Sequence, residues 1–170
     1  MTAFVALLRA VNVGGRQLAM AELKSVAQEL GLENCRTFIA SGNLLFTSDW
    51  DERQLVRELG KAIGGHMGKT VEVVVRTGAE MAKVDAANPF ADQPGNRVVA
   101  IFLDEAPPAE TVARAKNIAD ERLALGRREI YVHYPSGQGR SKLKIPAAAA
   151  GTARNMNTVK KLAELAKETK

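Results

Sequence analysis

The first half of the chain alternates between two hydrophobic patterns. Unbroken apolar runs predict buried strands, and apolar residues three or four positions apart, such as Leu55, Leu59 and Ile63, predict the buried stripe of a helix. The elements that these patterns predict are, in order, a strand at 3–9, a helix at 20–31, strands at 35–40 and 44–48, a helix at 51–68 and a strand at 70–76.

Turn and cap residues separate these elements. Gly31 follows the last apolar position of the first helix and predicts its C-terminal cap. Ser48 or Asp49 predicts the N-terminal cap of the second helix. The tripeptide at 41–43, Ser-Gly-Asn, predicts a tight hairpin between two strands. The resulting order, βαββαβ, is that of a ferredoxin-like unit, or alpha-beta plait.

The second half has a looser pattern of the same kinds of element. Its expected elements are a short helix at 77–88 capped by Thr77, a connection at 88–96, a strand at 97–103, a helix at 109–119 after Pro107 and Pro108, hairpin strands at 121–125 and 128–135, a loop with a short helix at 136–151, and a last helix that begins with Thr152 as its cap. The last helix has an apolar face that consists of Met156, Val159, Ala163 and Ala166, so we expect it to dock.

Together these patterns predict the α+β class, with two ferredoxin-like subdomains whose antiparallel sheets carry helices packed on one face. The expected limits are 1–76 for the first subdomain, 77–96 for a helical linker, and 97–170 for a second plait-like subdomain that ends in the last helix.

Composition is that of a soluble globular protein, with 46% hydrophobic and 25% charged residues among 170. No apolar run reaches the length of a membrane span, so no membrane partner is expected. The single cysteine, Cys35, excludes an internal disulfide and fits a reducing compartment. These features predict a cytoplasmic protein.

Positive charge is concentrated late in the chain. The net charge is +5, of which residues 1–76 supply +1 (nine basic and eight acidic side chains) and residues 77–170 supply +4 (fifteen and eleven). The stretch 136–161 contains no acidic residue. Such a patch attracts phosphates, carboxylates or nucleic acid, although a solvated face on a slightly basic protein explains it equally.

The sequence contains no recognisable pattern for metal binding or nucleophilic catalysis. His66 and His133 lie far apart and lack the spacing of metal ligands, and no cofactor is expected. No nucleophile-elbow serine, phosphate-binding P-loop or dinucleotide fingerprint occurs. Anion binding is therefore the chemistry that remains.

One candidate anion site follows from the topology of the first subdomain. Its first loop and its hairpin should lie at the same edge of the sheet, so Arg9 should approach Asn43. Arginine, asparagine and glycine N–H groups together can hold a phosphate or carboxylate. Alternatively, the asparagines satisfy loop backbone groups and Arg9 pairs with a carboxylate. The residues gathered there are Arg9, Asn12, Gly14, Gly15, Arg16, Ser41, Gly42 and Asn43.

A second candidate lies at the start of the last helix. Unpaired N–H groups at a helix N-terminus favour an anion, with Thr152 as cap and Asn155 at the third helical position. Capping alone explains the threonine and one asparagine, but it does not explain Arg154 or its basic neighbours Arg140 and Lys142.

The motifs "ALLRAVNVGG", "MAELKSVAQELG", "RTFIASGNLLF" and "TARNMNTVKKLAEL" resemble, in order and spacing, a bacterial family of uncharacterised proteins, domain of unknown function 1697. "NPF" and "YVHYPSGQGRSKL" resemble its later segments. The resemblance implies two ferredoxin-like subdomains and no established activity. Met156 departs from the aromatic residue that the family often has there.

The sequence thus leads to one main hypothesis and two alternatives. The main hypothesis is binding of a phosphate-bearing ligand, a nucleotide or a nucleic acid, at an Arg/Asn/Gly-rich edge. One alternative is an enzyme that clamps a small anionic substrate with arginines, although no acid–base pair stands out. The other is a protein-interaction module without a ligand.

Overall fold

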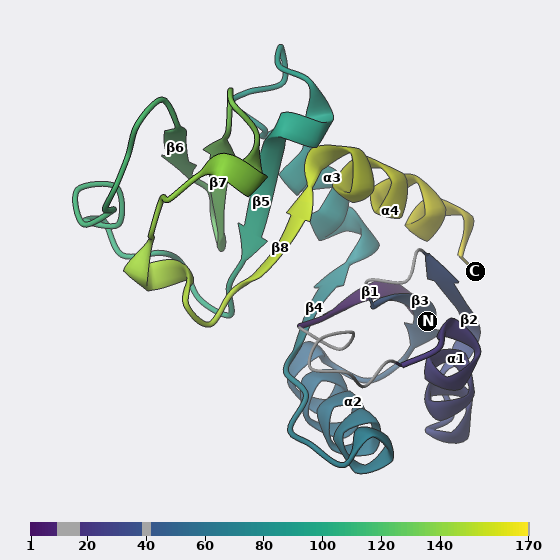
Figure 1. The fold of residues 1–170 in the computed structure, drawn as a ribbon. Coiled ribbons are helices and arrows are strands. Elements are labelled where there is room, and N and C mark those ends of the chain that lie inside the picture. The colour runs from purple at the N-terminus through teal and green to yellow at the C-terminus, as the bar shows by residue number, and fades with distance from the viewer. Residues whose placement is uncertain (10–17, 39–41, 170) are drawn as a thin grey trace. The chain divides into compact units, whose positions relative to one another are not determined.

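The chain forms two compact units in a computed structural model that describes residues 1–9, 18–38 and 42–169 (Figure 1). Unit 1 consists of Met1–Ala82 together with Leu162–Lys170, and unit 2 consists of Lys83–Lys161. Each unit contains one four-stranded antiparallel sheet. The predicted α+β class is therefore confirmed.

Unit 1 has the strand order predicted for a ferredoxin-like sheet, β2-β3-β1-β4, and every neighbouring pair is antiparallel. Its elements are β1 (Thr2–Leu8), α1 (Met20–Glu29), β2 (Glu33–Phe38), β3 (Asn43–Ser48), α2 (Glu52–Met67) and β4 (Val73–Thr77). Two further helices, α3 (Gly78–Ala86) and α4 (Met156–Glu168), each contribute residues to both units.

The core of unit 1 lies between its sheet and the helices α1 and α2. Alternate residues of β1, beginning with Phe4 and Ala6, point to this side, where Leu23 of α1 and Leu59 of α2 meet them. The rings of Phe4 and Phe46 stack with centroids 5.8 Å apart. Both helices thus cover one face of the sheet, as the amphipathic patterns predict.

The helix ends of unit 1 follow the cap rules, with one correction. Gly31 has a φ of +89°, which ends α1 as predicted. Asp51, and neither Ser48 nor Asp49, caps α2, since its Oδ1 accepts a hydrogen bond of 2.8 Å from the N–H of Gln54. Ser48 instead accepts from the N–H of Trp50, so it closes the turn that precedes the helix.

Unit 2 repeats this sheet order when its strands are numbered from its own start. Its sheet runs β6-β7-β5-β8, which is second-third-first-fourth, as in unit 1. The elements are a 3-10 turn at Gly95–Arg97 (η1), β5 (Val98–Phe102), β6 (Arg122–Leu125), β7 (Glu129–His133), 3-10 turns at Gln138–Arg140 (η2) and Pro146–Ala148 (η3), and β8 (Thr152–Asn155).

The predicted helix at 109–119 is wrong: this segment consists of turns and an isolated bridge. Lys116 and Lys144 exchange two backbone hydrogen bonds, 2.8 and 2.9 Å long, and these replace helical bonds. Val112 and Ile118, two apolar residues of this segment, are 41% and 45% exposed. Because the segment has no apolar face to bury, a helix there would not be stabilised by packing, and the segment pairs with the 136–151 loop instead.

The start of the last helix also differs from the prediction. Thr152–Asn155 forms strand β8, which pairs antiparallel with β5 at the edge of the sheet. Thr152 therefore lies opposite Phe102 and caps no helix. Asn155 is the cap instead, because its Oδ1 accepts a 2.9 Å hydrogen bond from the N–H of Thr158. The predicted apolar face of α4, from Met156 to Ala166, is buried.

One face of the unit 2 sheet is covered by loop residues where unit 1 has helices. Ile101, Ile130 and Val132 form the centre of this cluster, and Tyr134 lies at its end. The residues that pack over them are partly buried and come from the connection after β7, namely Leu143, Ile145, Ala147 and Ala148. This irregular cover leaves an open pocket beside Tyr134.

Candidate functional site

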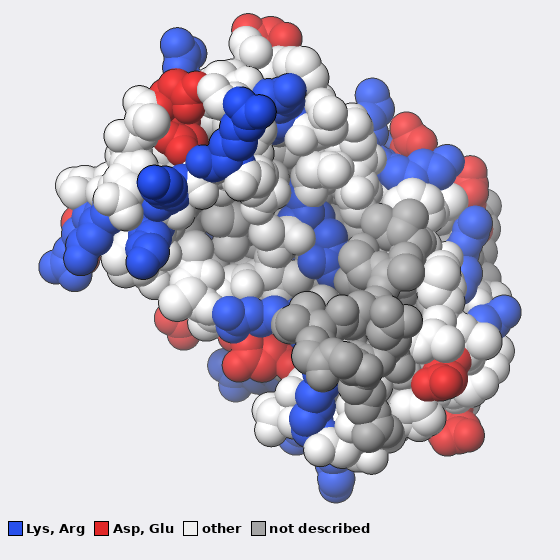
Figure 2. All heavy atoms as spheres, viewed as in Figure 1, with Lys and Arg blue, Asp and Glu red and all other residues white. Residues whose placement is uncertain are grey.

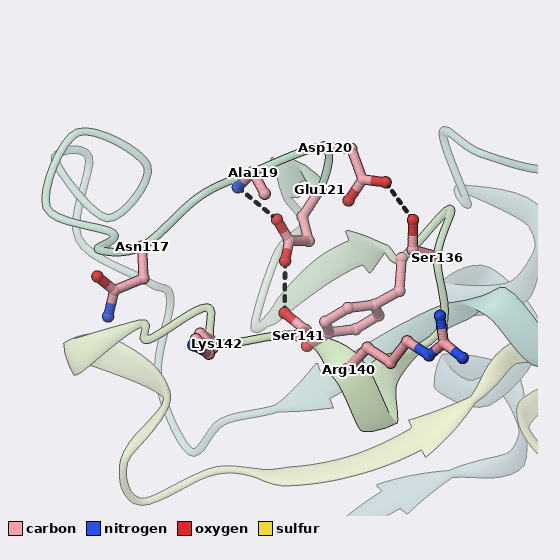
Figure 3. Close-up of a pocket in the computed structure, with 10 residues that line it drawn as sticks. Asn117, Ala119, Asp120, Glu121, Ser136, Arg140, Ser141 and Lys142 are labelled. Atoms are coloured by element: carbon pink, nitrogen blue, oxygen red, sulfur yellow. Dashed lines mark hydrogen bonds between the residues drawn. The ribbon is translucent and has the colours of Figure 1, made fainter.

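The candidate site is a pocket of about 510 Å³ in unit 2, between the segment that leads into β6 and the η2 turn (Figure 3). Its volume falls within the range of small-molecule sites. The residues that line it are Asn117, Ala119, Asp120, Glu121, Tyr134, Ser136, Gly137, Arg140, Ser141 and Lys142.

Glu121 connects the two walls of the pocket. Its Oε1 accepts a 2.7 Å hydrogen bond from the N–H of Ala119, and its Oε2 accepts one from the hydroxyl of Ser141 (Figure 3). The Ser141 hydroxyl, followed by the Ala119 N–H, lowers the pKa of Glu121 below its ordinary value. Glu121 is therefore an ionised, hydrogen-bonded carboxylate at neutral pH.

A second carboxylate–serine pair lies beside the first. Ser136 donates a 2.6 Å hydrogen bond to Oδ2 of Asp120 (Figure 3). Ser141 accepts a 3.1 Å bond from the N–H of Leu143 while it donates to Glu121. Both serines thus hold the loop after β7 against the acidic segment before β6.

Two basic side chains complete the pocket. Arg140 and Lys142 flank Ser141 and are exposed, with Arg140 extending toward Ser136 and Lys142 on the other side of Ser141 (Figure 3). Within the described part of the chain, neither side chain has a hydrogen-bond or ion-pair partner. The space-filling view shows Lys and Arg side chains gathered over the region of β6 and β7, with acidic side chains among them (Figure 2).

The backbone around Tyr134 holds this part of the pocket in place. Arg97 donates a 2.7 Å hydrogen bond to the carbonyl of Pro135, and Gly137 turns the chain with a φ of +88°. Tyr134 is only 8% exposed, and burial, together with the charge of Glu121, raises the pKa of its phenol. The phenol is therefore neutral across the physiological range.

The first predicted anion site is described only in part. Arg9 forms a 3.0 Å ion pair with Glu72, and the side-chain N–H of buried Asn43 donates to the carbonyl of Phe38. These contacts are the ones expected if Arg9 pairs with a carboxylate and the asparagine supports its turn. Anion binding there stays a prediction. Gly42 is described and has a φ of +81°, and the five remaining residues lie outside the described part of the chain: Asn12, Gly14, Gly15, Arg16 and Ser41.

The second predicted site divides into two parts. Arg140 and Lys142 line the pocket, whereas Thr152, Arg154 and Asn155 belong to β8 and do not contribute to its lining. Arg154 is largely desolvated, which lowers its pKa to about 10, so it remains charged at neutral pH. Thr152 is buried, and its hydroxyl has no hydrogen-bond partner among the described residues.

Sequence reasoning missed the acidic wall of the pocket. Glu121 and Ser141 are 20 residues apart, and neither belongs to a recognised motif. A usable signal was the pair Asp120-Glu121 directly before a strand, followed by a loop with serines at 136 and 141. Only the fold brings these segments together.

The described residues contain neither a metal site nor a membrane-spanning helix. Residues 1–9, 18–38 and 42–169 contain no group of three or more histidine, cysteine, aspartate or glutamate side chains able to hold a metal ion. Over the same ranges, every helix is too short or too polar to cross a membrane.

The two sheets, which share one strand order, define an α+β protein with two ferredoxin-like sheets. The family model described as "Protein of unknown function (DUF1697)" matches residues 1–131, and the chain belongs to this family. A solved structure of a conserved bacterial protein from Streptococcus pneumoniae is similar, with a TM-score of 0.79 and 27% sequence identity. That similarity covers 97% of this chain and 98% of the other. No curated protein matches the sequence.

Proposed function

We propose that this protein binds a phosphate-bearing ligand in the unit 2 pocket, with Arg140 and Lys142 as the groups that hold the phosphate. The observation that carries the proposal is the presence of two exposed cations, without partners in the described part of the chain, on the wall of a pocket of about 510 Å³. Guanidinium and ammonium groups are the side chains that recognise phosphate best.

The state of the two pocket carboxylates supports this assignment. Glu121 has both oxygens in hydrogen bonds, and Asp120 has one oxygen bonded to Ser136. Because the acids are held by hydroxyl and N–H groups, they do not neutralise Arg140 or Lys142 by direct contact. The two cations remain available to an incoming anion.

A small ligand fits the site better than a nucleic acid. Proteins of this fold that bind single-stranded RNA stack bases on exposed aromatic side chains. All eight aromatic residues of this chain are at least partly buried. Basic residues near the pocket would still attract backbone phosphates, and such binding would weaken steeply with added salt.

One contact, the hydrogen bond from Ser141 to Glu121, raises the question of an enzymatic role. A hydroxyl bonded to a carboxylate that another group orients is the arrangement of a nucleophile and its base. The lowered pKa of Glu121 makes it a weak base, however, so the contact serves structure better than proton transfer. We expect equal background hydrolysis of p-nitrophenyl phosphate by the wild type and by Ser141→Ala. A loss of turnover in this variant would support the enzyme instead.

We further propose a cytoplasmic location. Cys35, the chain's single cysteine, is buried, and burial raises the pKa of its thiol. A buried protonated thiol fits a reducing compartment.

Calorimetry with inorganic phosphate and pyrophosphate at low ionic strength tests the binding proposal. Arg140→Ala should lower the affinity about ten- to hundredfold, because one charge-assisted hydrogen bond contributes about 1.5–3 kcal/mol. Arg127→Ala is the matched control, since Arg127 is also exposed in unit 2 but lies outside the pocket. An equal effect of the two substitutions, or no binding by the wild type, would refute the proposal.

A further inference from the structure

The pocket is lined by side chains of both signs of charge. Asp120 and Glu121 come from the segment before β6, and Arg140 and Lys142 from the loop after β7, so the formal charges of the lining cancel. A general anion trap would carry an excess of cations. The cancellation means that a bare phosphate gains attraction from one pair and meets repulsion from the other.

The acidic wall retains hydrogen-bonding capacity. A carboxylate offers about four acceptor sites on two oxygens, and Ser136 occupies one site on Oδ2 of Asp120. No hydrogen bond to the other oxygen is formed within the described part of the chain. Asp120 is exposed, so that oxygen can accept from a ligand. A ligand that places a hydrogen-bond donor against this oxygen gains a favourable interaction with Asp120, where a bare phosphate meets only repulsion.

The remaining lining limits what the ligand can be. Tyr134 shows only 8% of its surface, too little for a nucleobase to stack on, and Asn117 offers an amide at the far end of the pocket. The volume of about 510 Å³ accommodates a phosphate and a small polar body. Hydroxyl groups suit this environment because they donate to carboxylates and accept from amides.

We infer that the ligand is the phosphate ester of a polyhydroxy compound, that is, a sugar phosphate. This inference rests on the proposed phosphate site. Its phosphate lies against Arg140 and Lys142, and its hydroxyls donate to Asp120. A free sugar phosphate and the ribose phosphate of a nucleotide share this chemistry, and the small open face of Tyr134 favours the free sugar phosphate.

Competition calorimetry at low ionic strength tests the inference, with inorganic phosphate, ribose 5-phosphate and ribose as probes. We expect ribose 5-phosphate to bind about tenfold more tightly than phosphate, and ribose alone to bind weakly. Asp120→Asn should strengthen binding of phosphate, because it removes a repulsive charge. It should also narrow the preference for ribose 5-phosphate over phosphate, because the amide keeps one acceptor oxygen where the carboxylate has two. The matched control is Asp104→Asn, an exposed acid outside the pocket.

The outcomes separate the inference from the proposal on which it rests. If phosphate and ribose 5-phosphate bind equally, and both depend on Arg140, the sugar phosphate is excluded while the phosphate site stands. If neither binds, or if binding is unaffected by Arg140→Ala, both fail. Adenosine 5′-monophosphate should bind no more tightly than ribose 5-phosphate, and tighter binding would overturn the preference for a free sugar phosphate. Circular dichroism of each variant checks that it is folded.

Discussion

At the scale of single residues, the hydrogen bond between Ser141 and Glu121 is one of the side-chain contacts that hold the two pocket walls together. The two backbone bonds between Lys116 and Lys144 join the loop after β7 to the segment before β6, and the side chains of Ser136 and Ser141 add bonds to Asp120 and Glu121 beside the pocket. The bond from Ser141 stabilises the ionised form of Glu121. The shape of the pocket should therefore depend on pH.

Ser141→Ala tests this dependence. A carboxyl whose pKa is lowered by folding adds stability above its unfolded pKa, near 4.5, and loses it as pH falls through the folded pKa. We expect the NMR-measured pKa of Glu121 to rise in Ser141→Ala, and the acid-induced loss of stability to shrink. The exposed Ser25→Ala should change neither quantity. An unchanged pKa in Ser141→Ala would show that the bond does not form in solution.

Tyr131 offers a test at alkaline pH. Its buried hydroxyl donates a 2.7 Å hydrogen bond to the carbonyl of Val84, and burial raises its pKa to about 12. Because the unfolded state releases this proton first, stability should fall as pH rises from about 10 to about 12. Tyr131→Phe should lose about 1 kcal/mol of unfolding free energy at neutral pH. It should also show a shallower alkaline decline, measured by urea unfolding at each pH.

The residue patterns predicted part of the pocket and none of its acidic wall. Arg140 and Lys142 stood out because their stretch of sequence contains no acid. Glu121 looked like the first residue of a strand, and its partner at 141 was one of two serines in a loop. A contact between two loops that are distant in sequence produces no repeating pattern of residues, so the sequence alone could not show that Glu121 and Ser141 meet.

At the scale of elements, the predictions succeeded where a buried face requires apolar residues at regular intervals along the sequence. The strands and helices of unit 1 follow such periods, and so does the apolar face of α4. They failed at 109–119, where a helix was predicted but the apolar residues Val112 and Ile118 are exposed. They failed also at 152–155, where good capping residues form an edge strand. In both places a backbone pairing partner distant in sequence decided the structure.

Neighbouring glycines in α2 provide a matched test of element stability. A Cβ on Gly65 would meet no atom within 4 Å, so Gly65→Ala should stabilise the protein by about 0.5–1 kcal/mol. A Cβ on Gly64 would lie 2.9 Å from the carbonyl oxygen of Lys69, within a turn fixed by two hydrogen bonds to the Gly64 carbonyl. Gly64→Ala should therefore destabilise it, by about 1–3 kcal/mol. Thermal unfolding of the two variants compares them directly, and equal shifts would contradict the expectation.

At the scale of the whole molecule, the C-terminal half of α4 belongs to unit 1. Leu162 is fully buried and Leu165 nearly so, and Ala166 lies against Gly78 at the start of α3. Glu168 also approaches Arg36 of β2, at 3.6 Å, but an exposed ion pair contributes little. Apolar burial accounts for most of the stabilisation that this segment provides.

Truncation after Lys161 should therefore destabilise unit 1, although the cut is far from its other residues in sequence. Each buried leucine contributes about 1.5–3 kcal/mol, so the loss of two amounts to a large share of a domain's stability. Hydrogen exchange should show reduced protection in β1 and β4. Glu164→Ala and Lys167→Ala, which alter only exposed residues of the same segment, should leave exchange unchanged. Full protection of β1 in the truncated chain would disprove this role.

The return of the chain to unit 1 also bears on how the protein is made. Domains at the start of a chain usually fold while the ribosome is still synthesising the later residues. Here Met1–Ala82 emerges first, but Leu162 and Leu165 emerge only after all of residues 83–161 have been translated. Unit 1 is thus completed only after unit 2 has been synthesised. Until then its uncovered apolar surface would be a natural substrate for chaperones.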